Sequence, residues 1–326
     1  MSTERLDAFM ARANAAYYAT HDPFADFTTA PEITQVFGEV LGLWAAVTWQ
    51  MLGSPSPVML IEAGPGRGTL MADALRAISR AMPAFRAALS VHLIETSPRL
   101  RAVQARAVPD AVWHDDLASV PAGPMVLLAN EFFDALPIRQ FVKQAAGWTE
   151  RFVGAAGFEE HPCDEPLPAD APEGAIQERC EPALGFIRAL ASRFAAAPGA
   201  ALFLDYGPEH SGFGDSLQAL AGGKPADPLD APGTADLTAH VDFAALAAAA
   251  RAEGAAVHGP VPQGLFLAAL GLFQRANRLA MHLPPAQAAA VMDAARRLGE
   301  PNRMGRLFKA LAISSTGCPA LPGLEA

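Results

Sequence analysis

Residues 58–71 read VMLIEAGPGRGTLM, an apolar run that ends at three closely spaced glycines and continues as helix-like sequence. The pattern predicts a strand, a tight turn and a helix. Glycine suits positions where the backbone has a positive φ or lies against a ligand, and the first N–H groups of a helix are unpaired donors. The stretch is therefore typical of a nucleotide-type pocket, although a glycine-rich turn without a ligand would look similar. A dinucleotide fingerprint would have its third glycine at Thr69.

The composition of the 326 residues narrows the class of protein. The net charge of −10 argues against a nucleic-acid partner, because such proteins usually carry a basic face. The cysteines at 163, 180 and 318 are too scattered for a zinc site or a disulfide framework, so we expect reduced thiols and no metal. The chain has no secretion signal and no run of about 18 apolar residues. This predicts a cytoplasmic protein without membrane insertion.

Three further apolar runs, at residues 90–94, 111–114 and 124–129, also end in polar residues. We expect an α/β fold with a Rossmann-like sheet and helices on both faces. Ligands of such sheets bind outside the carboxyl ends of the strands. The residues predicted to bind a cofactor there are Glu62, Gly64, Pro65, Gly66, Gly68, Glu95, Asp115, Asp116 and Asn130.

The identity of the cofactor depends on the acids at the strand ends. Glu95 lies 27 residues after Gly68, where an acid can accept hydrogen bonds from both hydroxyls of a ribose. The alternative is an acid that only serves the start of the next helix. Apart from Arg67, these strand ends carry no basic residue that could hold a pyrophosphate. The pattern therefore favours S-adenosylmethionine over a nicotinamide cofactor.

Several separated blocks carry a family resemblance, and they span nearly the whole chain in one order. They are residues 26–33, 37–39, 64–73, 129–137, 205–207, 214–215, 227–229, 235–243 and 304–309. With these blocks the sequence resembles the MidA-like family of class I methyltransferases, which contains the mitochondrial complex I assembly methyltransferase and its bacterial relatives. The resemblance implies a Rossmann-like methyltransferase fold and S-adenosylmethionine as cofactor. It also implies a protein substrate, an arginine on a core subunit of respiratory complex I.

The sequence departs from the family pattern in two places. The loop at 24–27 is shorter than in relatives, and Gly222-Gly223-Lys224 stands where relatives commonly carry a histidine. Both departures leave open a cofactor-binding assembly factor with little or no turnover. A nicotinamide-dependent oxidoreductase is the other alternative, and only the glycine turn and Glu95 favour it.

The remaining segments predict the elements around the sheet. We expect an amino-terminal helical extension at 1–56, with helices at 3–19 and from Pro31 to about residue 52, packed on a catalytic domain at 57–326. Insertions are expected at 138–154 (a β-hairpin), 208–237 (a long loop) and 261–299 (two helices, 264–279 and 285–298). Residues 155–181 read as an irregular loop, 182–197 as a helix, and 200–204 and 304–314 as strands.

The catalytic candidates are residues that could hold a guanidinium group. A carboxylate that binds a guanidinium draws its positive charge away from the attacking nitrogen, and it can also accept a proton. Glu131 and Asp134, beside the expected methyl end of the cofactor, are the first candidates. Glu32, from a polar cluster before its helix, and His240 are the second. A capping or structural role explains His240 equally well.

Overall fold

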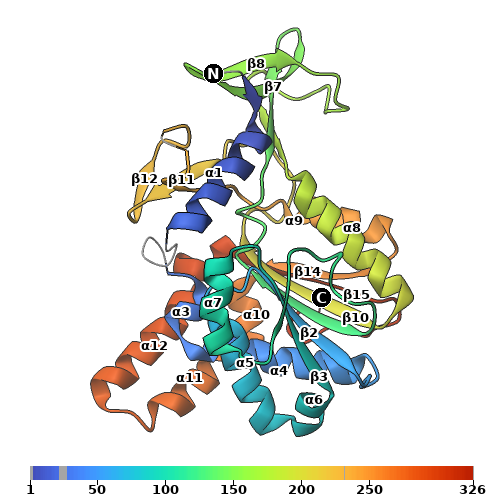
Figure 1. The fold of residues 1–326 in the computed structure, drawn as a ribbon, viewed down its shortest axis with the longest axis vertical. Coiled ribbons are helices and arrows are strands. Elements are labelled where there is room, and N and C mark those ends of the chain that lie inside the picture. Colours follow the sequence, from blue (N-terminus) through green and yellow to red (C-terminus); the bar gives the residue numbers. More distant parts are fainter. Residues whose placement is uncertain (1–2, 22–27, 231, 326) are drawn as a thin grey trace. The chain divides into compact units, whose positions relative to one another are not determined.

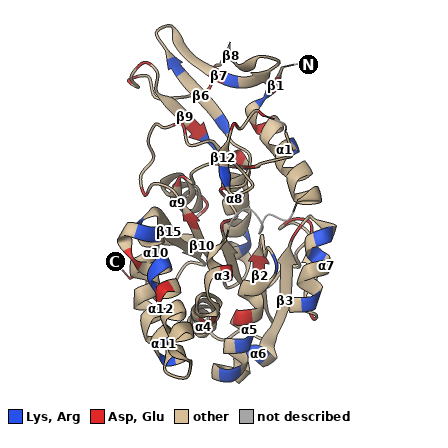
Figure 2. Cartoon of the chain, turned by 90° about the vertical axis from the view of Figure 1, so that its left-hand side faces the viewer, with Lys and Arg blue, Asp and Glu red and all other residues tan. Residues whose placement is uncertain are grey.

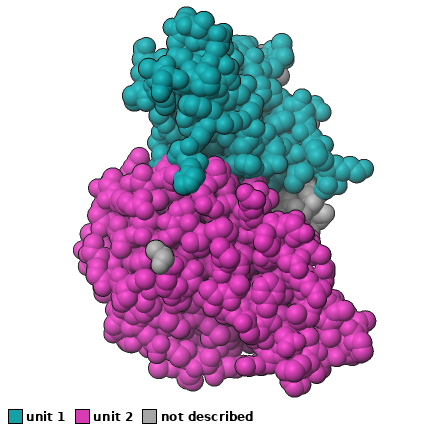
Figure 3. Space-filling model, turned by 180° about the vertical axis from the view of Figure 1, so that it is seen from behind, with its two compact units in different colours: residues 1–27, 133–185, 210–241 teal, residues 28–132, 186–209, 242–326 magenta. Residues whose placement is uncertain are grey.

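The computed structural model describes residues 3–21, 28–230 and 232–325, so the shortened loop at 24–27 lies outside the described residues. The chain forms two compact units, each of three segments (Figure 3). Unit 1 comprises residues 1–27, 133–185 and 210–241, and unit 2 comprises residues 28–132, 186–209 and 242–326. The domain boundary that the sequence suggests at residue 56 stays a prediction.

Unit 2 contains a mixed sheet with seven strands in the described part of the chain (Figure 1). The strand order is β14 (Ala256–Pro262), β15 (Phe308–Ser314), β10 (Gly199–Tyr206), β5 (Met125–Asn130), β2 (Val58–Ala63), β3 (Leu89–Ile94) and β4 (Val112–His114). All pairs from β10 to β4 are parallel, whereas β15 is antiparallel to both of its neighbours. This sheet confirms the predicted α/β fold class. The sequence did not predict β14, whose pairing is interrupted between His258 and Val261.

Every residue of β2 and β5 is buried, because helices cover both faces of this sheet. Leu60 and Val126 belong to the same buried cluster as Phe37 and Trp44. The α-helices that lie wholly in unit 2 are α3 (Ala30–Ile33), α4 (Gln35–Met51), α5 (Thr69–Ala81), α6 (Pro83–Ala88), α7 (Pro98–Ala107), α9 (Phe243–Ala252), α10 (Gln263–Ala269), α11 (Leu272–Ala280) and α12 (Pro285–Gly299). A short π-helical segment, Pro301–Gly305, precedes β15, so the strand expected from residue 304 begins only at Phe308.

Two predicted helices are each split in the structure. The helix expected from Pro31 to about residue 52 is α3 followed by α4, because Thr34 adopts an extended backbone and caps α4 through its side chain. The helix expected at 264–279 is α10 followed by α11. There Gly271 has a φ of +84° and ends one helix before the next begins.

Unit 1 contains α1 (Leu6–Thr20) and two small sheets. The first sheet holds β1 (Glu4–Arg5), β6 (Arg139–Gln144), β7 (Gly147–Gly154), β8 (Gly157–Pro162) and β9 (Ile176–Arg179). The second holds β11 (Gln218–Ala221), β12 (Lys224–Ala226) and β13 (Asp236–Thr238). The expected hairpin at 138–154 is present as β6 and β7. The prediction of irregular loops at 155–181 and 208–237 was wrong, because short polar strands such as β8 carry no apolar alternation.

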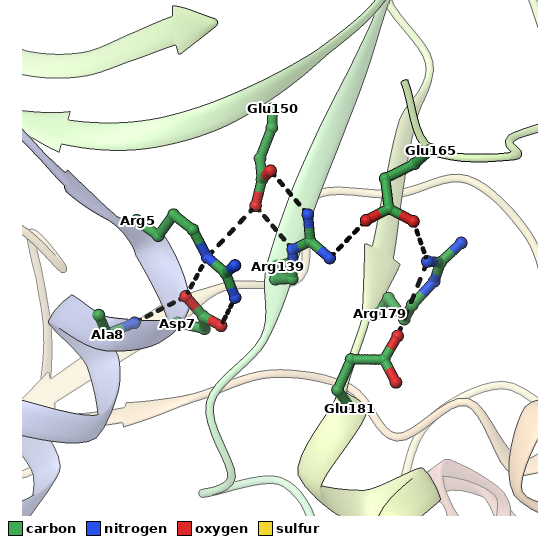
Figure 4. A network of polar contacts seen from close by, with 8 residues as sticks. All are labelled: Arg5, Asp7, Ala8, Arg139, Glu150, Glu165, Arg179 and Glu181. Carbon is green, nitrogen blue, oxygen red and sulfur yellow. Dashed lines mark hydrogen bonds and ion pairs between the residues drawn. The ribbon is translucent and has the colours of Figure 1, made fainter. Parts of the chain in front are cut away.

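The interior of unit 1 combines a small apolar core with ion pairs. Leu6 and Phe9 of α1 share a buried cluster with Leu237. In the first sheet the guanidinium of Arg139 donates to both oxygens of Glu150, at 2.7 Å each, and to Glu165 at 2.7 Å (Figure 4). The chain of alternating charges continues on both sides, through Arg5, Asp7, Arg179 and Glu181. Helix α8 (Glu181–Ala196) begins in unit 1 and continues in unit 2.

Candidate functional site

The glycine turn connects β2 to α5 in unit 2. Its three glycines have φ values of +66° (Gly64), +54° (Gly66) and +80° (Gly68), all in the left-handed region that side chains disfavour. Gly68 is the N-cap of α5, so the first N–H groups of that helix lie at the turn. A Cβ atom on Gly64 would stand 3.0 Å from the ring of Phe132, which follows β5. The turn therefore depends on glycine for its backbone conformation, and Gly64 also leaves room for Phe132 in the loop after β5.

Two buried polar atoms at adjacent strand ends have no hydrogen-bond partner among the described residues. They are Oε2 of Glu62 and Oδ1 of Asn130. Burial raises the pKa of Glu62 to about 8, although the Met71 N–H donates to its carboxyl group. Buried polar groups normally have partners, so a polar ligand that bonds to these atoms fits this edge of the sheet.

Glu95 follows β3, and both of its carboxylate oxygens accept hydrogen bonds. The Ser97 N–H donates to Oε1 at 2.7 Å, and Gln104 Nε2 donates to Oε2 at 3.2 Å. Burial raises the pKa of Glu95, and these two donors oppose the rise. Each oxygen keeps a lone pair for a ligand hydroxyl, so the geometry serves the ribose role as well as the local role near the start of α7.

Asp115 and Asp116 follow β4 and are exposed. Asp115 pairs with Arg101 at 2.5 Å, and the Ser119 N–H donates to Asp116 Oδ1 at 2.8 Å. The hydrogen bonds from Ser119 lower the pKa of Asp116. Both acids therefore lie at the expected sheet edge but are engaged locally, and their contact with a cofactor stays a prediction.

Glu131 directly follows β5 and has a φ of +50°, which is uncommon for a residue other than glycine. Its Oε1 accepts hydrogen bonds from Asn130 Nδ2 at 2.9 Å and from the Ala30 N–H at 3.1 Å. Burial raises the pKa of this carboxyl group. Strained backbone of this kind is concentrated at functional sites, because only the surrounding structure can maintain it.

Glu32, the third catalytic candidate, lies beside the glycine turn. The Thr69 hydroxyl donates to Glu32 Oε1, and Arg67 Nη1 is 3.8 Å from Glu32 Oε2. The structure thus joins Glu32 to the turn that begins α5. This contact suits a residue that shapes the cofactor pocket, and a part in catalysis stays a prediction.

Asp134 and His240 belong to unit 1, whereas Glu131 and the glycine turn belong to unit 2. Within unit 1 the backbones of Asp134 and His240 lie close together, because the N–H of Ala239, the residue before His240, donates to the Asp134 carbonyl at 2.9 Å. Asp134 is buried and His240 is exposed. The His240 N–H donates to Ser216 Oγ at 2.8 Å. Their catalytic roles stay predictions.

Two residues at the site are not among the predicted cofactor-binding and catalytic residues. Asp205, at the end of β10, is buried and accepts from the N–H groups of Phe132 and Tyr206, so it fixes the loop after β5. The apolar run that precedes Asp205 was a signal for it, since it is another strand with a polar end. Gln104, on α7, contacts the glycine turn and Glu95. Nothing in the pattern of α7 distinguishes this glutamine from an ordinary polar helix residue.

The described residues include no group of three or more His, Cys, Asp or Glu side chains that could hold a metal ion. Within the same ranges, every helix is too short or too polar to cross a bilayer.

Comparison with known proteins identifies the family. The model of the family described as "Putative S-adenosyl-L-methionine-dependent methyltransferase" matches residues 40–261. The chain belongs to this methyltransferase family. Among curated relatives, the mouse (Mus musculus) "Protein arginine methyltransferase NDUFAF7, mitochondrial" is 35% identical over 337 residues, which cover 91% of this chain and 77% of the relative. The Drosophila melanogaster homolog is 34% identical and covers 95% of this chain and 80% of the relative.

A solved structure agrees in fold and cofactor. The crystal structure of a family relative from Burkholderia thailandensis, bound to S-adenosyl-homocysteine, superimposes with a TM-score of 0.80 at 27% identity. The match covers 99% of this chain and 89% of that chain. The protein is thus an S-adenosylmethionine-dependent methyltransferase. The positive-φ glycines and the two unpartnered buried oxygens fit this cofactor.

Proposed function

We propose that this methyltransferase transfers a methyl group to the guanidinium of an arginine on a protein partner. The resemblance in the sequence suggests a core subunit of respiratory complex I as that partner. The relatives named as protein arginine methyltransferases support the acceptor. The cytoplasmic location expected from the sequence is part of the same proposal.

The carboxyl group of Glu131, at the end of β5, is the main structural support for an arginine as the acceptor. The end of β5 presents a carboxyl group that is held by Asn130 and the Ala30 N–H through Oε1 alone. Its Oε2 carries no hydrogen bond to the described residues, so this oxygen is free to accept one from a guanidinium N–H. A cationic acceptor would add to the stabilisation that Glu131 already receives from its two hydrogen bonds and from the positive charge of Arg297, whereas an anionic acceptor would be repelled.

The distribution of charge supports a basic protein partner. Unit 1 has 7 basic and 18 acidic residues, a net charge of −11, whereas unit 2 has 17 basic and 16 acidic residues, a net charge of +1. The whole net negative charge of the chain, −10, therefore comes from unit 1. Figure 2 shows the basic residues in blue and the acidic residues in red along the chain. An acidic surface accelerates the encounter with a basic segment and disfavours acidic partners.

The side chains of the site divide the chemistry among them. The bound cofactor supplies a methyl group on a positively charged sulfur. The glycine turn and Glu95 would hold the adenosine part, and Glu62, with its pKa of about 8, is mostly protonated at neutral pH and can donate a hydrogen bond. Glu131 would orient the guanidinium, draw its positive charge away from the attacking nitrogen and accept the proton that this nitrogen loses. Burial raises the pKa of Glu131, so its carboxylate is a stronger base than an exposed one.

The proposal is tested by incubating the purified protein with methyl-labelled S-adenosylmethionine and a lysate from a strain that lacks the gene. We expect the label in methylarginine after acid hydrolysis, and mass spectrometry should find the unmethylated arginine on a complex I subunit in the deletion strain. Label in another amino acid would refute the acceptor. Cofactor binding without any transfer would support the assembly-factor alternative.

A further inference from the structure

Gln104 is an unusual residue for its position on α7. Its side chain is 0% exposed, although arginines at 99, 101 and 106 make the rest of the helix strongly polar. Burying an amide is unfavourable unless its donors and acceptor find partners, and a leucine would fill the same volume without that requirement. A buried glutamine at this position therefore indicates that its hydrogen bonds hold specific neighbouring groups in place.

Gln104 bonds to groups that follow or belong to three neighbouring strands. Its Nε2 donates to the carbonyl of Gly66, after β2, at 2.8 Å and to Glu95 Oε2, after β3, at 3.2 Å. Its Oε1 accepts from the indole N–H of Trp113, in β4, at 2.8 Å. These partners fix the orientation of the amide. If its oxygen and nitrogen were exchanged, the oxygen would face the two acceptors, Gly66 and Glu95, and the indole N–H of Trp113 would lose its acceptor.

We propose that Gln104 is a positioning residue, which holds the Glu95 carboxylate and the glycine turn in the arrangement that binds the adenosine part of the cofactor. The Ser97 N–H fixes one oxygen of Glu95, and Gln104 fixes the other. The hydrogen bond from Gln104 to the Gly66 carbonyl, at 2.8 Å, supports this role because it joins α7 directly to the turn. The glutamine thus transmits the position of the turn to the acid at the next strand end.

The inference is tested by binding of S-adenosyl-homocysteine, measured by titration calorimetry. Gln104→Leu should weaken binding about 10- to 100-fold, the usual effect of losing a hydrogen bond to a charged group. The matched control is Gln263→Leu, at another glutamine with 0% exposure in unit 2, whose amide donates to the Leu298 carbonyl. It should change the affinity by less than about 3-fold, although it also replaces a fully buried glutamine by leucine. Equal losses in the two variants would overturn the proposal.

Two further measurements separate positioning from general packing. Loss of the Gln104 donor raises the pKa of Glu95, so this carboxylate becomes protonated at a higher pH in Gln104→Leu. As the pH is lowered, cofactor binding by the variant should therefore weaken at a higher pH than binding by the wild type. In a Glu95→Gln background, Gln104→Leu should cost less than it does alone, and strictly additive losses would contradict the proposal. If Gln104→Leu does not fold, Gln104→Glu keeps the side-chain length and the acceptor for Trp113. It places a second carboxylate beside Glu95, and binding as tight as in the wild type would equally overturn the proposal.

Discussion

Every residue of β2 and β5 in unit 2 is buried, whereas β8 and β9 in unit 1 contain no buried residue. The two units are consequently stabilised in different ways. Apolar burial on both faces holds the parallel sheet of unit 2 together, and its polar groups are gathered at the strand ends. In unit 1 the strands are joined by bidentate ion pairs such as that of Arg139 with Glu150. We infer that unit 2 provides the strand ends that bind the cofactor, while unit 1 provides the acidic residues that attract a basic partner.

The largest effect is expected from Gly66→Val. A branched side chain at a φ of +54° is strained, and it would lie where the cofactor approaches the turn, so binding of S-adenosyl-homocysteine should be abolished. The matched control in unit 1 is Gly222→Val, at a φ of +58° with open space around the Cβ position. It should bear the same backbone strain and keep cofactor binding. Calorimetry showing wild-type affinity for Gly66→Val would refute the role of the turn.

Glu131→Gln tests the acceptor side of the same sheet edge. An amide keeps most of the size of the side chain but loses the negative charge and the proton acceptor, so methyl transfer should fall about 1,000-fold. Binding of the cofactor should remain within about 3-fold of wild type, because Glu131 is assigned to the acceptor. Glu160→Gln, on the exposed strand β8, is the control and should leave transfer unchanged. An unchanged rate for Glu131→Gln in a radiolabel assay would remove this residue from the mechanism.

Arg139→Met probes the stability of unit 1. The side chain of Arg139 is 13% exposed and that of Glu150 is 8% exposed, so the variant leaves a nearly buried carboxylate without its main partner. Removing one member of such a pair typically costs about 3–5 kcal/mol of unfolding free energy. The control Arg12→Met removes a pair whose arginine side chain is 56% exposed and should cost less than about 1 kcal/mol. Equal costs in denaturant titrations would contradict the contrast between the units.

The same contrast explains which features the sequence could predict. The strand ends at Glu62 and Asn130 were predictable, because an uninterrupted apolar run and a polar stop are both visible in the sequence. Strand β8 was not, since all of its residues after Gly157 are exposed and no apolar alternation marks a buried face. Gln104 could not be predicted either. Its importance comes from Trp113 and Gly66, which only the folded chain brings within 2.8 Å of it.

We expect the stability of unit 2 to depend on pH through its buried acid, Glu62. An ordinary glutamate has a pKa near 4.5, and burial raises that of Glu62 to about 8. Between these values the unfolded chain is ionised at this residue and the folded chain is protonated, so folding takes up a proton and stability falls as pH rises. By pH 7 the loss is about 3 kcal/mol, and it is complete above pH 8. Glu62→Gln lacks this dependence, so its unfolding free energy relative to wild type should increase from pH 4.5 to 8 in urea titrations. A constant difference would show that Glu62 is ionised in the folded protein, and hence that the strand end is more polar than its burial implies.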